Sequence, residues 1–383
     1  MVMRSLDSIR CKEPPFLRGA VFSDLHLGSK RNPTAEKIAK LNRAIRDNPN
    51  IAELDYLFFA GDVYDDNLNH SSDEVIEIDF WIADTLRVCK KHKIKLRVLL
   101  GTRSHDHKQP RRFSAINHIT HIGADLQYID EIKVVREDGV SILYIPDDVD
   151  RDTDRIFHTA KTKMMEQGLE KVDLAIMHGQ FEFQLPEVVR APKHDSEKYL
   201  SIVNYYVFIG HVHTHSVYKD IVAQGSFDRE THGQEENKGH VRFEINTLTK
   251  EKRCKLVVNR DAKIFKTIRV TQKDMEKALE AISKQILNKV PDGSFVRIIA
   301  DKEHPIHANF KRVHLLYPMI TFTSAVAESK KAGSLNLIDE VQTYKTIEIT
   351  PNNIVQLVID KASTLTNNSS LLTMSRELLA AIR

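Results

Sequence analysis

The stretch FSDLHLG, residues 22–28, places an aspartate and a histidine directly after a short apolar run. The run at 17–23 is typical of a buried strand, so Asp24 and His26 are expected at its carboxyl end. Because side chains in a strand repeat every two residues, Asp24 and His26 are predicted to point to the same side and to reach one ion. In open α/β sheets, ligands bind beyond the carboxyl ends of the strands, so a binding site is expected here.

Further segments share this arrangement, in which residues of metal-ligand type follow an apolar run. They are AGDVYDD (60–66), GTRSHD (101–106), MHGQF (177–181) and GHVHTH (210–215). Asp62 follows a glycine at a sharp turn, where a carboxylate can lie between two ions. His211 and His213 stand two residues apart after an apolar run and are predicted to share one face.

Each segment also has an ordinary structural interpretation. Asp-x-His in a loop is most often a solvated turn, Gly-Asp after a strand is a common turn, and His178 alone suits a hydrogen-bonded core histidine. Together, each after an apolar run, the segments favour a metal site. Mixed carboxylates and imidazoles suit Mn²⁺, Fe²⁺ or Zn²⁺ better than Ca²⁺ or Mg²⁺. Two such ions about 3.5–4 Å apart can polarise a phosphate, activate water and stabilise a leaving oxygen.

The spacing of apolar residues predicts an α/β domain, because short apolar runs alternate with amphipathic helical patterns. Strands are expected at 17–23, 54–60, 94–100, 141–145, 172–177 and 205–209, and helices at 34–47, 72–91 and 152–168. Beyond residue 209 the sheet is expected to become largely antiparallel, with short strands at 217–219, 222–223, 241–245 and 255–258.

A second unit is predicted from about Lys263, where the pattern reads strand, helix, strand, helix, strand. The expected strands are 264–270, 294–300 and 319–324, and the expected helices are 273–287 and 308–315. We therefore predict domains at 1–260 and 261–328, followed by a linker and C-terminal helical segment at 329–383. That segment has helix patterns at 352–361 and 370–382.

Composition restricts the class of protein. The 383 residues are 41% hydrophobic and 28% charged, which is ordinary for a globular protein, and the net charge is +3. This balance allows a local patch for nucleic acid but does not argue for one. Cys11, Cys89 and Cys254 form no CxxC pair, and no apolar run has the length of a signal peptide or a membrane span. A soluble protein of the reducing cytoplasm is expected, with no membrane partner.

Taken in order, the segments resemble the calcineurin-like metallophosphoesterase superfamily over roughly residues 17–250. Its pattern is D-x-H, G-D-x-x-D, G-N-H-[DE], an isolated His with Gly, and G-H-x-H. The resemblance implies a four-layer α/β sandwich and two divalent ions, with Mn²⁺ the expected metal. It implies a first ion held by Asp24, His26 and His213, a second held by His178 and His211, Asp62 between them, and Asp65 as a support.

The third segment departs from the family pattern, because the family's asparagine ligand is absent. Aligning Ser104-His105-Asp106 with Asn-His-Asp gives Ser104, or alternatively Thr102, as a hydroxyl in place of the amide. A neutral hydroxyl is a weaker ligand, so the second ion is expected to bind loosely. The resemblance implies a catalytic role for His105 and Asp106, with His105 assisting the departing oxygen.

A second resemblance concerns AQGSFDRETHGQEENKGHVRFEI, residues 223–245, which is similar to a stretch of SbcD-type exonucleases of double-strand-break repair. The matching positions are Gly225, Ser226, Arg229, Gly233, Lys238 and Gly239. It implies a DNA exonuclease or endonuclease subunit of repair and recombination, with residues 261–328 in the place of a DNA-capping domain. It also implies a C-terminal segment that docks an SbcC-like coiled-coil ATPase. Packing on its own core is the alternative for that segment, and a homodimer stays open.

Basic residues around the third segment are the candidates for phosphate contacts on DNA, and a solvated basic turn is the alternative. They are Arg103, Lys108, Arg111 and Arg112. Two other functions stay open. One is a metallophosphodiesterase or phosphatase for a substrate other than DNA. The other is a weakly catalytic subunit that positions DNA or recruits an ATPase, which the missing asparagine favours.

Overall fold

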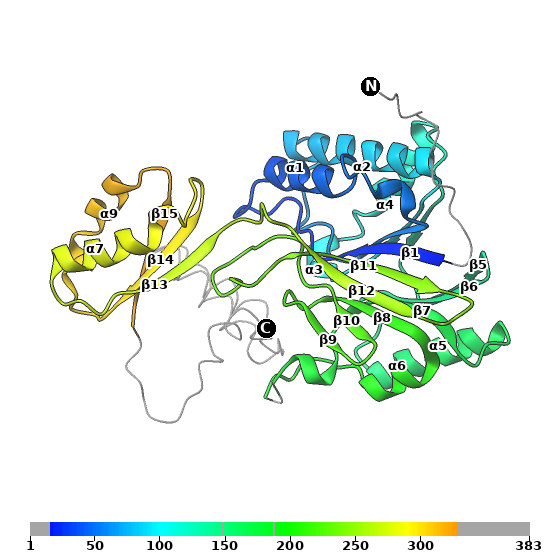
Figure 1. Ribbon diagram of the computed structural model, residues 1–383. Coiled ribbons are helices and arrows are strands. Elements are labelled where there is room, and N and C mark those ends of the chain that lie inside the picture. The colour runs from blue at the N-terminus through cyan, green and yellow to red at the C-terminus, as the bar shows by residue number, and fades with distance from the viewer. Residues whose placement is uncertain (1–15, 148, 187, 328–383) are drawn as a thin grey trace, which may run out of the picture. The chain divides into compact units, whose positions relative to one another are not determined.

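The computed structural model describes residues 16–147, 149–186 and 188–327 (Figure 1). The chain divides into one compact unit at Met1–Glu328 and another at Ser329–Arg383. The predicted linker and C-terminal helices, and with them the predicted docking segment, lie outside the described residues, as does Cys11. Helices and strands alternate in several sheets, so the predicted α/β class is confirmed. The predicted division at residue 260 stays a prediction.

The first sheet has six strands in the order β12-β11-β1-β2-β3-β4. Strands β1 to β4 run parallel, so their carboxyl ends lie at one edge. Strands β11 and β12 are antiparallel additions beside β1. The strands are β1 (Phe16–Phe22), β2 (Tyr56–Ala60), β3 (Lys95–Leu99), β4 (Leu126–Ile129), β11 (Gly239–Asn246) and β12 (Lys252–Val258).

The second sheet also has six strands, in the order β5-β6-β7-β8-β10-β9. Its four central strands are parallel, and β5 and β9 pair antiparallel at the two edges. The strands are β5 (Lys133–Glu137), β6 (Val140–Ile145), β7 (Val172–Gly179), β8 (Val203–His211), β9 (Ser216–Tyr218) and β10 (Ile221–Ala223).

The short strands beyond residue 209 pair largely antiparallel, as expected, but they do not form a sheet of their own. The short strands after β8 join two existing sheets: β10 extends the second sheet parallel to β8, whereas β11 and β12 return to the first sheet. Strands β4 and β5 were also absent from the prediction. The reason is that the apolar content of a short strand indicates burial and does not specify which neighbour it pairs with.

A core between the two sheets explains why the central strands read as continuous apolar runs. All five residues of β2 are buried, since one face of the strand meets the helices and the other meets the second sheet. Phe58 from the first sheet lies 6.5 Å from Tyr144 of the second, centroid to centroid. The inter-sheet core and the helix-covered core are therefore built from alternate residues of the same strands.

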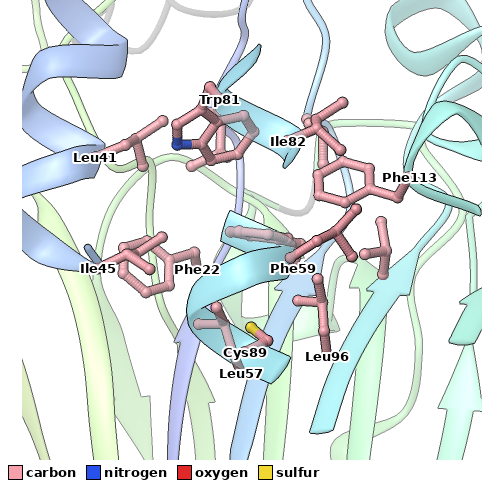
Figure 2. Packing of buried hydrophobic residues seen from close by; sticks show 14 of the residues in the cluster. Phe22, Leu41, Ile45, Leu57, Phe59, Trp81, Ile82, Cys89, Leu96 and Phe113 are labelled. Carbon is pink, nitrogen blue, oxygen red and sulfur yellow. The ribbon is translucent and has the colours of Figure 1, made fainter. Parts of the chain in front are cut away.

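Helices cover the other face of the first sheet and form a second core with it (Figure 2). The rings of Phe59, Trp81 and Phe113 meet there, with centroids 5.7–5.9 Å apart. Ser72 caps the longest of these helices, because its side chain accepts from the Val75 amide. The helices are α1 (Thr34–Ala44), α2 (Asp73–His92) and α4 (Arg111–Ile119).

Two further helices contribute to a core on the outer side of the second sheet, α5 (Thr153–Glu166) and α6 (Ser196–Ile202). Helix α4 and helix α6 were not expected, because the first follows a basic turn and the second spans seven residues. Within the part of the chain that the structure describes, no helix is long and apolar enough to cross a membrane.

A three-stranded parallel sheet with its own hydrophobic core follows residue 263, in the order β13-β14-β15. The elements follow the predicted alternation, except that the expected helix at 308–315 is divided at Asn309 into two short ones. They are β13 (Phe265–Arg269), α7 (Met275–Ile286), β14 (Phe295–Ala300), α8 (Pro305–Ala308), α9 (Phe310–Leu316) and β15 (Thr321–Val326). A role of this sheet in capping DNA stays a prediction.

Candidate metal centre

The predicted ligands come from loops and strand ends of both sheets, and backbone hydrogen bonds hold these segments together. The Asp24 amide donates to the Gly61 carbonyl at 3.1 Å, and the Leu25 amide donates to the Asp62 carbonyl at 2.8 Å. The His211 amide, from the second sheet, donates to Asp24 Oδ1 at 3.0 Å. The carboxyl ends of both sheets therefore contribute to one site.

The structure brings the predicted ligands together as groups that could hold a metal ion. In one, His26 Nε2 lies 3.0 Å from His213 Nε2, and His213 Nε2 lies 3.8 Å from Asp24 Oδ1. In another, His178 Nε2 lies 3.3 Å from Asp62 Oδ2, and His211 is the third member. Within each group the ligand atoms lie within 4.8 Å of one another. The position of Asp62 between two ions stays a prediction.

Asp24 and His26 belong to one group, as predicted, but strand alternation does not bring them together and does not describe His211 and His213 either. Strand β1 ends at Phe22, and His211 and His213 belong to different groups. The backbone instead bends sharply, because four candidate ligands have a positive φ, which is uncommon for residues other than glycine. They are Asp24 (52°), His26 (47°), Asp62 (50°) and His211 (97°). Strained backbone of this kind costs about 1–3 kcal/mol per residue and concentrates at functional sites.

Glycines permit the close approach of the loops. A Cβ at Gly101 would lie 2.1 Å from the Asp62 amide nitrogen and 2.3 Å from Asp62 Oδ1. A Cβ at Gly210 would lie 2.5 Å from the Ala60 carbonyl oxygen. Both positions therefore require the absence of a side chain if the two sheets are to place their ligands in one site.

We expect Gly101→Ala to displace Asp62 and to weaken metal binding, because the added methyl meets backbone that cannot move aside. Overpacking of this kind typically costs about 1–3 kcal/mol. Titration with Mn²⁺ and thermal unfolding of the metal-free protein measure the two effects. Gly168→Ala is the control for Mn²⁺ affinity alone: no atom lies within 4 Å of the added Cβ, although its φ of 68° strains any side chain and lowers stability. Equal Mn²⁺ affinity in the two variants would contradict the prediction.

The second group contains a buried pair of opposite charges, His178 and Asp62. His178 Nδ1 donates to the Ala60 carbonyl at 2.7 Å, which turns Nε2 toward Asp62. Burial lowers the pKa of His178, but the charge and hydrogen bond of Asp62, together with the charges of Asp24 and Asp147, outweigh it and hold the pKa well above the usual value. Burial raises the pKa of Asp62, but the charge and hydrogen bond of His178, together with the charges of His26 and His105, outweigh it, so the pKa is lowered. A divalent cation bound here would take the place of the proton on His178.

Neighbouring side chains orient the histidines of the first group. His26 Nδ1 lies 3.1 Å from Asp65 Oδ1, which points Nε2 at the site. The Gln234 side-chain nitrogen lies 2.7 Å from His213 Nδ1, and Lys238 Nζ donates to the His213 carbonyl at 2.8 Å. Burial lowers the pKa of His213 to about 3, so its imidazole is neutral, as a metal ligand must be. Gln234 was missed by sequence reasoning, although it lies within the 223–245 stretch that carried the second resemblance.

His105 lies beside the first group, with its ring edge-on to His26 at 4.8 Å between centroids. His105 Nδ1 donates to the Asp65 carbonyl at 2.7 Å, so Nε2 is the ring nitrogen that can exchange a proton with a substrate.

Asp106 is buried, and its carboxylate accepts from the Gly101 amide at 2.7 Å and the Tyr64 amide at 3.0 Å. Burial raises the pKa of Asp106 to about 7. These contacts tie the second segment to the third, and the catalytic role that the resemblance implies for Asp106 stays a prediction.

The hydroxyl that reaches the second group belongs to Thr102, the alternative of the sequence analysis. Thr102 Oγ1 lies 3.2 Å from Asp62 Oδ2, 3.3 Å from His211 Nδ1 and 3.5 Å from His178 Nε2. Ser104 is exposed on α3 (Arg103–Asp106), because the helical turn that begins after Thr102 carries it outward. The structure therefore favours Thr102, directly after Gly101, over Ser104 as the source of the hydroxyl at the second group.

The predicted DNA-binding residues divide into two kinds. Arg103 and Lys108 are exposed. Arg111 pairs with Asp130 at 2.8 Å, and Arg112 forms a two-point ion pair with Asp79 in which Nε lies 2.8 Å from Oδ1. A guanidinium already paired with a carboxylate gains less from a phosphate, so Arg103 and Lys108 are the stronger candidates.

Comparisons with known proteins identify no family for this chain. No family model matches the chain, and no curated protein matches it. Among solved structures, 42 chains match. One of them is 11% identical, with a TM-score of 0.36, and the match covers 63% of this chain and 99% of the other. Likeness at this level carries no argument about function.

Proposed function

We propose that the chain is a metal-dependent DNA nuclease with a four-layer metallophosphoesterase sandwich. The observation that carries the proposal is the pair of His/Asp groups that meet across two sheets, Asp24-His26-His213 and Asp62-His178-His211. Its support is the donor chemistry, since mixed carboxylates and neutral imidazoles suit Mn²⁺. The two six-stranded sheets with helices on their outer faces are consistent with such a sandwich.

When bound, the two ions would polarise the phosphate and lower the pKa of the attacking water. The chain's own residues have separate tasks. His178 and His211 present nitrogen ligands from the second sheet, and Asp24 and Asp62 present carboxylates from the first. His105 Nδ1 donates to the Asp65 carbonyl, so Nε2 is the nitrogen that would give a proton to a departing oxygen when the ring is doubly protonated. Asp65 contacts both rings, His26 through its carboxylate and His105 through its backbone carbonyl.

DNA as substrate rests on the sequence resemblance and on the exposed cations Arg103 and Lys108 beside His105. An exonuclease or endonuclease subunit of repair and recombination is the activity proposed, with an SbcC-like ATPase as partner. End-labelled single- and double-stranded DNA, incubated with Mn²⁺, Mg²⁺ or chelator, tests the proposal. We expect Mn²⁺-dependent cleavage that the chelator abolishes. Cleavage unaffected by chelator would contradict it.

A phosphodiesterase for another substrate is the second candidate. The ion pairs of Arg111 and Arg112 favour it, because they reduce the cationic surface that would contact a DNA backbone. Turnover of a generic phosphodiester with no salt-dependent DNA binding would favour this candidate. Metal binding without turnover of either substrate would indicate instead a subunit that only positions DNA.

A further inference from the structure

A carboxylate that the resemblance does not assign lies against the second metal group. Asp147 follows β6, a central strand of the second sheet, and its amide donates to the Leu100 carbonyl at 3.3 Å. This bond joins the end of β6 to the end of β3, so the side chain enters the site from the second sheet. Asp147 Oδ2 lies 3.1 Å from Thr102 Oγ1 and 3.9 Å from His211 Nδ1, and the side chain is 25% exposed.

The donor atoms around Thr102 have the spacing of ligands that share one ion. Ligands at neighbouring corners of an octahedron, each about 2.1 Å from the ion, are about 3.0 Å apart. Thr102 Oγ1 lies 3.1–3.5 Å from Asp62 Oδ2, Asp147 Oδ2, His178 Nε2 and His211 Nδ1. These atoms come from both sheets, and Thr102 Oγ1 is the atom that all of them approach.

The Thr102 hydroxyl lies between two carboxylates. Thr102 has one hydroxyl proton, and two carboxylates, from Asp62 and Asp147, lie within hydrogen-bond distance of it. His178 Nδ1 is committed to the Ala60 carbonyl, which leaves Nε2 directed into the same space. These atoms therefore face one space, where a cation would contact all of them.

We propose that Asp147 is a ligand of the second metal ion and takes the place of the missing asparagine, an inference that rests on the proposed two-metal function. Its carboxylate supplies the strong oxygen ligand that Thr102 alone does not. With Asp62 it also brings two negative charges to the second ion, which balance the charge of a divalent cation. The second ion is therefore bound tightly, contrary to the loose binding that the missing asparagine predicts.

The experiment measures bound Mn²⁺ per chain by elemental analysis, and affinity by calorimetry, in the full-length protein. Wild type is expected to bind two ions. Asp147→Ala is expected to retain one and to bind the other at least about tenfold more weakly. Asp150→Ala is the matched control, since Asp150 is 27% exposed and pairs with Arg155 outside the site. It is expected to bind two ions with wild-type affinity.

A rescue variant separates a ligand from a merely structural residue. Thr102→Asn combined with Asp147→Ala puts an amide oxygen at the position after Gly101, and we expect it to restore binding of the second ion. Unfolding of the metal-free proteins checks that each variant folds. Wild-type affinity for two ions in Asp147→Ala would overturn the inference and leave the proposed function standing. A wild-type protein that binds no ion would overturn both.

Discussion

Asp62→Asn is expected to abolish binding of the second ion and to weaken that of the first. Asp62 is buried, its Oδ1 accepts from the Thr102 amide at 2.6 Å, and its Oδ2 lies 3.3 Å from His178 Nε2. Asparagine keeps the shape and the bond from Thr102, but removes the negative charge that pairs with a cation. Removing one partner of a buried charge pair typically costs about 3–5 kcal/mol, which corresponds to a fall in affinity of several hundredfold or more.

His213→Ala is the comparison for this prediction, because His213 belongs to the first group alone. It is expected to lose the first ion and to keep the second. Elemental analysis after gel filtration gives the number of ions retained by each variant. If Asp62→Asn weakens only the second ion, Asp62 does not lie between the two; unchanged binding of both would remove it from the site.

His105→Ala is expected to lower cleavage of DNA by a factor on the order of 10²–10⁴, the usual contribution of a general acid. The reason is that His105 Nδ1 donates to the Asp65 carbonyl, which leaves only Nε2 to give a proton to the departing oxygen from the doubly protonated ring. The variant is expected to bind Mn²⁺ normally, because His105 is not needed to complete either of the two main groups. The rate of cleavage at saturating Mn²⁺ is the measurement.

The matched control for His105 is its neighbour His107, which is exposed and whose Nε2 donates to the Ser104 carbonyl at 3.0 Å. His107→Ala is expected to cleave at close to the wild-type rate. A similar loss in the two variants would indicate that the turn, and not the His105 ring, is what cleavage requires. Wild-type cleavage by His105→Ala would show that another group protonates the departing oxygen.

The sequence by itself determined the α/β class and the residues that gather at the site. Strands such as β2 are buried on both faces, and burial on both faces leaves a continuous apolar run that can be recognised without a structure. The polar residues that interrupt these runs, Asp24, Asp62 and His178 among them, stand out for the same reason. Helix α2 was recognisable because Ser72 caps it and its apolar residues recur with helical spacing.

Only the tertiary structure decided which candidate ligands form each metal group and which further carboxylate, that of Asp147, lies beside the second group. Asp24, His26 and His211 have positive φ values, so the two-residue period of a strand does not apply to them. Two ligands that are close in sequence therefore need not reach the same ion. Asp147 carries no local signal, since its place beside Thr102 depends on β6 and β3 ending next to each other in different sheets. Contacts between distant segments arise from packing of whole sheets, and a single sequence does not contain that information in any local pattern.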